Sequence, residues 1–274
     1  MAPALCTSLL SMTDKSTVTR SKAQIKKNLR VYAIGDIHGC LDELKSLLGL
    51  IERDLKKNPI KSHRLIFLGD YVDRGPQCKG VIKHLIKVKR EGAPATFLLG
   101  NHDQRLISAH TEIEPRVLPG FIKFGGLKTL ASYGLGDDDF KVLRKDDPKP
   151  KDLKKFSKKL RGIMGEAQIK FLDELQLHTQ QDDYFFCHAG VDPVRKFTDQ
   201  DPHDLVWIRE PFLSWKKPLK KVVVHGHTVR DAPESLPHRI NVDTGCVYGE
   251  ALTAVVLEGT KQRFLQVPAA RHYW

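Results

Sequence analysis

The sequence predicts an α/β fold, and three features of its pattern support this prediction. Short apolar or β-branched runs recur along the chain, the early runs alternate with segments of helical periodicity, and a polar motif follows the end of several runs. The chain has 274 residues and 41% hydrophobic content, which is enough to bury a sizeable core. We therefore expect one large domain, over residues 29–274.

The predicted strands and helices follow from the spacing of apolar residues. Two helices are expected where that spacing has the helical period, over residues 41–55 and over residues 81–88, the second ending near Gly92. The later strands lie close enough together to form hairpins. The runs predicted to be buried strands are residues 31–34, 65–68, 96–99, 184–187, 222–224, 240–242 and 252–257.

Two segments fall outside this alternation. Residues 1–28 lack both the basic start and the organised apolar run of a secretory signal, so we expect a disordered tail. Lysines crowd residues 141–161, where Pro148 and Pro150 interrupt any regular pattern. We expect a solvated basic insertion at about residues 137–162, helical or partly ordered, because charge runs usually lie in water.

Composition argues against several classes of protein. No run approaches the 18 apolar residues that a membrane span needs. The five cysteines are odd in number, scattered and without a CxxC pair, so neither a disulfide framework nor a thiolate zinc site is expected, and a reducing cytoplasm fits best. The net charge of +12 is compatible with nucleic-acid binding, with a lysine-rich surface, or with attraction of phosphorylated, acidic substrates.

A polar motif follows each of five predicted strands. In an open α/β sheet, the loops beyond the carboxyl ends of the strands form the site crevice, so these motifs are expected to converge. Their opening glycines permit tight turns and close approach of the backbone to an ion. In chain order the motifs are GDIHG (35–39), GDYVDRGP (69–76), GNHD (100–103), HAG (188–190) and GH (226–227).

The side chains in these motifs are suited to a pair of metal ions. Asp36 and His38 alternate along one loop and can face one ion, while Asp70, at the end of the neighbouring strand, is placed to bridge two. The second ion's shell would be completed by Asn101, His188 and His227. This oxygen and imidazole set, without thiolate, suits manganese, iron, zinc, cobalt or nickel.

Two carboxylates against two divalent ions leave a formal charge of −2 + 4 = +2 at such a site. This surplus would attract a phosphate dianion and lower the pKa of a bridging water, which gives a hydroxide nucleophile near neutral pH. The sequence therefore predicts a metal-dependent phosphoesterase.

The five motifs resemble the signature series of the phosphoprotein phosphatase family, within the larger calcineurin-like metallophosphoesterases. The resemblance runs from about Val31 to Leu257, and its order and spacing are most similar to the bacterial and phage branch of serine/threonine protein phosphatases. The segment VDTGCVYGEALT (242–253) is similar to that branch's closing segment. The resemblance implies two mixed β-sheets packed as a sandwich and flanked by helices, with a dinuclear site at one edge.

The resemblance also implies a role for each matching residue. Asp36, His38 and Asp70 would hold the first ion, and the second would be held by Asp70, Asn101, His188 and His227. His102, paired with Asp73, would be the general acid for the departing alcohol, a task that suits an imidazole oriented by a carboxylate. The residues expected to bind the substrate phosphate are Arg74, Asn101 and Arg209, of which the two guanidinium groups match phosphate oxygens in shape.

Three functions remain open at this stage. The first is a serine/threonine protein phosphatase with two divalent ions, manganese first among the candidates. Its expected substrates are phosphorylated proteins or peptides, with small phosphoesters or nucleotides as further candidates. The alternative is a symmetrical diadenosine tetraphosphate hydrolase. Those enzymes tend to lack the acidic residue that corresponds to Asp73, so the presence of Asp73 disfavours this alternative. The third is a basic nucleic-acid-binding module without catalysis, which the complete set of ligand positions and the lack of a nucleic-acid motif disfavour.

Overall fold

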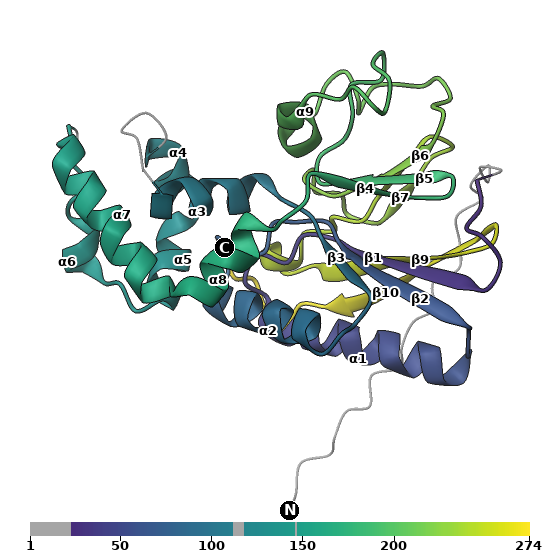
Figure 1. Cartoon of the computed structure of the whole chain (residues 1–274), viewed down its shortest axis with the longest axis horizontal. Helices are drawn as coiled ribbons and strands as arrows, with labels where there is room; N and C mark the ends of the chain where they lie inside the picture. Colours follow the sequence, from purple (N-terminus) through teal and green to yellow (C-terminus); the bar gives the residue numbers. More distant parts are fainter. Residues whose placement is uncertain (1–22, 112–117, 146) are drawn as a thin grey trace, which may run out of the picture.

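Two five-stranded mixed sheets pack face to face in the computed structural model, which describes residues 23–111, 118–145 and 147–274 (Figure 1). The first sheet has the order β10 (Lys261–Pro268), β9 (Ala251–Glu258), β1 (Leu29–Ile34), β2 (Ser62–Phe67) and β3 (Ala95–Phe97). The second has the order β4 (His178–Gln181), β5 (Tyr184–Cys187), β6 (Val222–His225), β8 (Arg239–Asn241) and β7 (Glu234–Ser235). This is the predicted sandwich.

Helices cover the outer faces and one end of the sandwich (Figure 1). The outer face of the first sheet carries α1 (Leu41–Lys57) and α2 (Cys78–Arg90), and α9 (Pro202–Trp207) lies on the second sheet. A short 3₁₀ helix, η1 (Cys246–Tyr248), precedes β9. The helices gathered at one end are α3 (Asn101–Thr111), α4 (Leu118–Lys123), α5 (Gly126–Ser132), α6 (Asp137–Phe140), α7 (Pro150–Met164) and α8 (Glu166–Asp173).

Strand β1 shows how the sequence builds this layered core. Successive side chains of a strand point to opposite faces, so a strand buried on both sides must be apolar throughout. Tyr32 and Ile34 pack with the helices of the outer layer, whereas Val31 and Ala33 pack between the two sheets. All four are fully buried, which explains why this run reads as continuously apolar rather than alternating.

The parallel strand pairs bring the polar motifs to one edge. β1 pairs in parallel with β2, and β2 with β3, so that the ends of the three strands lie beside one another. In the second sheet β5, β6 and β8 are likewise parallel neighbours. The loops that follow these strands therefore emerge on the same side of the sandwich, as the sequence pattern predicts.

The structure describes most of the predicted basic insertion but only the last residues of the predicted N-terminal tail. The basic insertion contains two helices, α6 and α7, and α7 buries Phe156 and Leu160 while its lysines face outward. Residues 1–22 of the predicted tail lie outside the described residues. Residues 23–28 belong to the packed structure, because Ile25 is only 1% exposed and its backbone N–H donates to the carbonyl of Gly259 at 2.8 Å. Within the described ranges, no helix is long and apolar enough to cross a membrane.

Replacing Ile25 tests whether the end of the predicted tail contributes to the fold. Ile25→Ala should lower the free energy of unfolding by about 2–5 kcal/mol, because it removes buried methyl groups from the core between the sheets. Denaturant unfolding measures this change. The exposed neighbour Lys26 is the control, and Lys26→Ala should change stability by no more than about 0.5 kcal/mol. Equal stability of the two variants would show that Ile25 packs too loosely to count as core.

Candidate metal centre

The motif loops adopt strained backbone conformations. Five of the seven non-glycine residues with positive φ in the described ranges belong to the predicted site. Such conformations cost about 1–3 kcal/mol each and persist where the surrounding structure imposes them, often at functional sites. These five residues are His38, Asp70, Asp73, Arg74 and His227.

Two glycines leave the room that the carboxylates need. A Cβ on Gly100 would lie 2.2 Å from the backbone nitrogen and from Oδ1 of Asp70. A Cβ on Gly226 would lie 2.1 Å from Oδ1 of Asp36. Since real Cβ contacts are much longer, any larger residue at either position would displace a carboxylate of the site.

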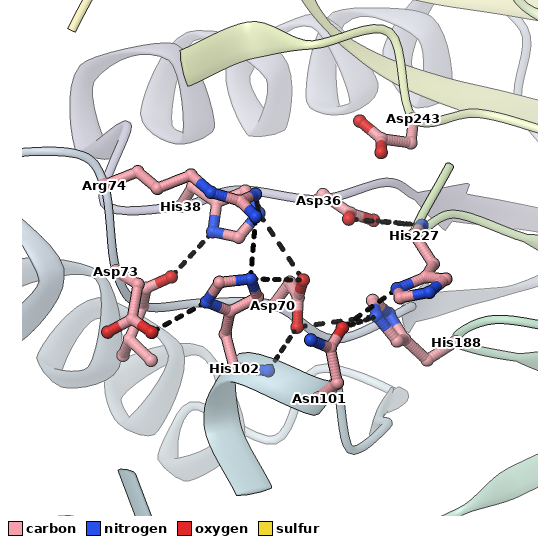
Figure 2. Close-up of polar contacts among 12 residues, drawn as sticks. Asp36, His38, Asp70, Asp73, Arg74, Asn101, His102, His188, His227 and Asp243 are labelled. Atoms are coloured by element: carbon pink, nitrogen blue, oxygen red, sulfur yellow. Dashed lines mark hydrogen bonds and ion pairs between the residues drawn. The ribbon is translucent and has the colours of Figure 1, made fainter. Parts of the chain in front are cut away.

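The carboxylate of Asp70 lies at the centre of the cluster, between His38 on one side and His188 on the other (Figure 2). Its Oδ2 is 3.4 Å from Nε2 of His38, and its Oδ1 is 3.5 Å from Nε2 of His188. The backbone N–H of His102 donates to Oδ1 at 2.9 Å. Each oxygen thus points toward a different imidazole, which is the arrangement that a bridging ligand requires.

Asn101 and His227 complete the side of the cluster that contains His188. The amide oxygen of Asn101 is 3.0 Å from Nε2 of His188 and 2.9 Å from Nδ1 of His227. Nε2 of His227 is buried and has no hydrogen-bond partner among the described residues. A buried nitrogen without a partner is costly, and a divalent ion would satisfy it.

Backbone carbonyls orient two of the imidazoles. Nδ1 of His38 lies 2.7 Å from the carbonyl of Val72, and Nδ1 of His188 lies 3.0 Å from that of Leu68. Since a carbonyl only accepts, both rings donate through Nδ1 and present the lone pair of Nε2 to the cluster. This is how metal-binding histidines are commonly fixed.

The electrostatics of the cluster also favour a cation. Burial raises the pKa of Asp36 well above its usual value, and the charges of Asp243 and Asp70 add to this effect. Burial lowers the pKa of His38 well below its usual value, and the Arg74 guanidinium acts in the same direction. The imidazole is therefore neutral, as a metal ligand must be, while several carboxylates share one buried space.

These donors fit a pair of divalent ions. Donor atoms of His38, Asp70 and His102 lie within 4.8 Å of one another, and so do those of Asp36, Asp70 and His188. Both groups include Asp70. The grouping differs in detail from the predicted one, because it places Asp36 with His188 and adds His102 beside His38.

His102 and Asp73 form a buried pair beside the cluster. Nδ1 of His102 is 2.7 Å from Oδ2 of Asp73, and neither side chain is more than 2% exposed. The hydroxyl of Thr129 donates to the other carboxylate oxygen of Asp73 at 2.6 Å. The carboxylate is thereby held in place, and it fixes the ring of His102 with Nε2 facing the cluster (Figure 2).

The two predicted phosphate-binding arginines occupy different positions. The guanidinium of Arg74 points into the cluster and lies 2.5 Å from Nε2 of His38 and 2.8 Å from Nε2 of His102. Arg209 is exposed and donates to Oγ1 of Thr228 at 3.1 Å. A second contact, 3.4 Å long, joins Arg209 to the carbonyl of His227. Arg74 therefore lies inside the site and Arg209 at its rim.

Sequence reasoning missed two carboxylates. Asp243 follows β8 and lies beside Asp36 (Figure 2), and burial raises its pKa to about 6. Its position directly after a predicted strand was the available signal. Asp103, the last residue of GNHD, accepts from the backbone N–H groups of Asp70, Tyr71 and Gly100 at 2.8–3.0 Å and so shapes the loop that carries Asp70.

Residues 29–250 match the family model of the calcineurin-like phosphoesterases. The chain belongs to this family. It is therefore a metal-dependent phosphoesterase of a family that uses a dinuclear divalent metal centre, and the His/Asp cluster described above is the matching feature of its structure.

Two curated relatives come from the same superfamily. The asymmetrical bis(5'-nucleosyl)-tetraphosphatase PrpE of Oceanobacillus iheyensis is 26% identical over 82% of this chain and 88% of its own length. The symmetrical bis(5'-nucleosyl)-tetraphosphatase of Coxiella burnetii is 28% identical over 92% of this chain and 97% of its own length. Among solved structures, a protein serine/threonine phosphatase from Saccharomyces cerevisiae shares the fold, with a TM-score of 0.54, 14% identity, and coverage of 90% of this chain and 82% of its own.

The comparisons support the predicted type of reaction but favour a different substrate. Dinuclear phosphoester hydrolysis stands as predicted. At the level of substrate, the two curated relatives are dinucleoside tetraphosphatases, which favours the alternative prediction over the serine/threonine protein phosphatase.

Proposed function

We propose that this protein hydrolyses bis(5'-nucleosyl) tetraphosphates. The observation that carries the proposal is the similarity to tetraphosphatases along nearly the whole length of both chains. Net charge supports it as well, because a chain with a formal charge of +12 attracts a polyanionic tetraphosphate more strongly than a neutral ester.

The proposed ligand assignment gives each ion its own side of Asp70. Asp36 and His38 would serve the first ion, Asp70 both ions, and the second ion would be served by Asn101, His188 and His227. When bound, two divalent ions would activate a water and neutralise charge on the reacting phosphate. Manganese is the proposed metal, since carboxylate, amide and imidazole ligands suit it. A cytoplasmic location is proposed from the four free, buried thiols of the described ranges.

The arginines would bind the phosphate chain at two positions. Arg74 lies against the imidazoles of His38 and His102, so it can bind oxygens of the phosphoryl group that reacts. Arg209 at the rim, with Asn101 deeper in the site, can bind oxygens further along the chain or on the same group. A guanidinium pairs with phosphate oxygens through two parallel hydrogen bonds.

One observation favours a second candidate, hydrolysis of phosphate monoesters such as phosphoserine peptides. The buried Asp73–His102 pair is built to hold an imidazole as a proton donor. Protonation matters greatly when the leaving group is an alkoxide, and less when it is a nucleotide phosphate, which departs as a stable anion. The pair is therefore more strongly needed for monoesters than for dinucleotides.

Incubation with diadenosine tetraphosphate and with a phosphoserine peptide, each with manganese, tests the proposal. We expect faster hydrolysis of the dinucleotide, measured as kcat/KM by chromatography of the products. Two ADP would indicate symmetrical cleavage, and ATP with AMP would indicate asymmetrical cleavage. A chelator should abolish the activity and manganese should restore it. Hydrolysis of the peptide alone would reject the proposal in favour of the second candidate.

Replacing His102 shows how strongly the reaction depends on protonation of the leaving group. His102→Asn should lower kcat for the phosphoserine peptide by about 10²- to 10⁴-fold, the usual contribution of a general acid. An aryl phosphate with a good leaving group should lose less, and Asp73→Asn should show the same pattern more mildly. Metal content must be measured in both variants because His102 adjoins Asn101. Equal losses on both substrates, with metal retained, would show that His102 is not the acid.

A further inference from the structure

A second cluster of metal-binding side chains lies outside the catalytic centre. Sγ of Cys40, a carboxylate oxygen of Glu43 and Sγ of Cys246 lie within 4.8 Å of one another. These residues are 0%, 3% and 2% exposed. The sequence pattern does not predict this cluster, because Cys246 is distant along the chain and the cysteines form no CxxC pair.

The carboxylate of Glu43 is only half satisfied. Its Oε1 accepts from the backbone N–H of Ala270 at 3.1 Å and from the hydroxyl of Tyr273 at 3.0 Å. Its Oε2 is buried and has no hydrogen-bond partner among the described residues. A buried polar oxygen without a partner is expensive, so this atom is a second indication that a ligand belongs in the cluster.

We propose that Cys40, Glu43 and Cys246 bind a zinc ion through three protein ligands, with a water in the fourth tetrahedral position. Two sulfur ligands and one carboxylate suit zinc, whereas the catalytic centre offers oxygen and nitrogen only. Two S–Zn bonds and one O–Zn bond form, and the two S–H bonds break with release of their protons to solvent. The charge balances, because the ion adds two positive charges and the departing protons remove two.

The proposed ion would join three segments that meet at this point. Cys40 directly precedes α1 and follows the GDIHG loop, whereas Cys246 begins η1 in the loop that carries Asp243. Glu43 holds the end of the chain through Ala270 and Tyr273. Zinc at this position would fix two of the loops that supply carboxylates to the catalytic centre, those of Asp36 and Asp243, without touching substrate.

Cobalt is the probe that separates this site from the catalytic centre, because only thiolate ligands give a sulfur-to-cobalt charge-transfer absorption in the near ultraviolet. The full-length protein is stripped of metal under reducing conditions and then loaded with cobalt or zinc. We expect the thiolate band in the wild type, its loss in Cys246→Ala, and one zinc equivalent fewer in that variant. Cys187→Ala, which removes a buried thiol that donates to the Gly190 carbonyl instead, should keep both.

A second variant covers the case in which Cys246→Ala does not fold. Glu43→Gln keeps the size of the side chain and should weaken zinc binding while the thiolate band is retained at saturating cobalt. The proposal is wrong if the wild type gives no thiolate band, or if the band survives unchanged in a folded Cys246→Ala variant. Peptides joined by a Cys40–Cys246 disulfide, found by mass spectrometry of an unreduced digest of a wild type without the extra metal, would also overturn it.

Discussion

The candidate site depends on the placement of one carboxylate between two groups of imidazoles. Asp70 is 1% exposed, and burial alone would raise its pKa. Coulombic effects of His188, His102 and His38, and of the Arg74 guanidinium, outweigh burial and keep the pKa of Asp70 well below its usual value. The buried carboxylate therefore stays charged, and the loops around it are arranged to hold that charge.

Much of the surrounding structure serves this placement. Asp103 binds the backbone N–H groups of Asp70 and Tyr71, and Gly100 leaves room for the carboxylate where a Cβ would collide with it. Parallel pairing of β1, β2 and β3 brings the loops together, and the second sheet supplies His188 and His227 from the opposite layer. The centre therefore lies where the two sheets meet, and it needs both to be complete.

The sequence predicted the parts of this account that depend on local pattern. Strand β5 has the predicted limits, and α1 and α2 are slightly longer than expected. β4, β7 and β10 were missed because β4 is polar, β7 has two residues, and β10 is half-exposed along most of its length. The site residues could be chosen because each motif follows a strand. Asp243 also follows a predicted strand but lies outside the five motifs, and the Cys40–Cys246 cluster depends on contacts between distant segments. The sequence pattern could not predict the substrate either, because the same motifs occur in enzymes that hydrolyse different phosphoesters.

Metal content of two variants tests most directly whether Asp70 bridges two ions. Asp70→Ala should lose both ions, because its two oxygens face different imidazole groups, whereas Asn101→Ala should lose only the ion on the side of His188 and His227. Elemental analysis after loading with manganese, with unfolding curves to confirm that both variants fold, gives the answer. Loss of the same single ion in both folded variants would contradict the account, because Asp70 would then be an ordinary ligand of one metal.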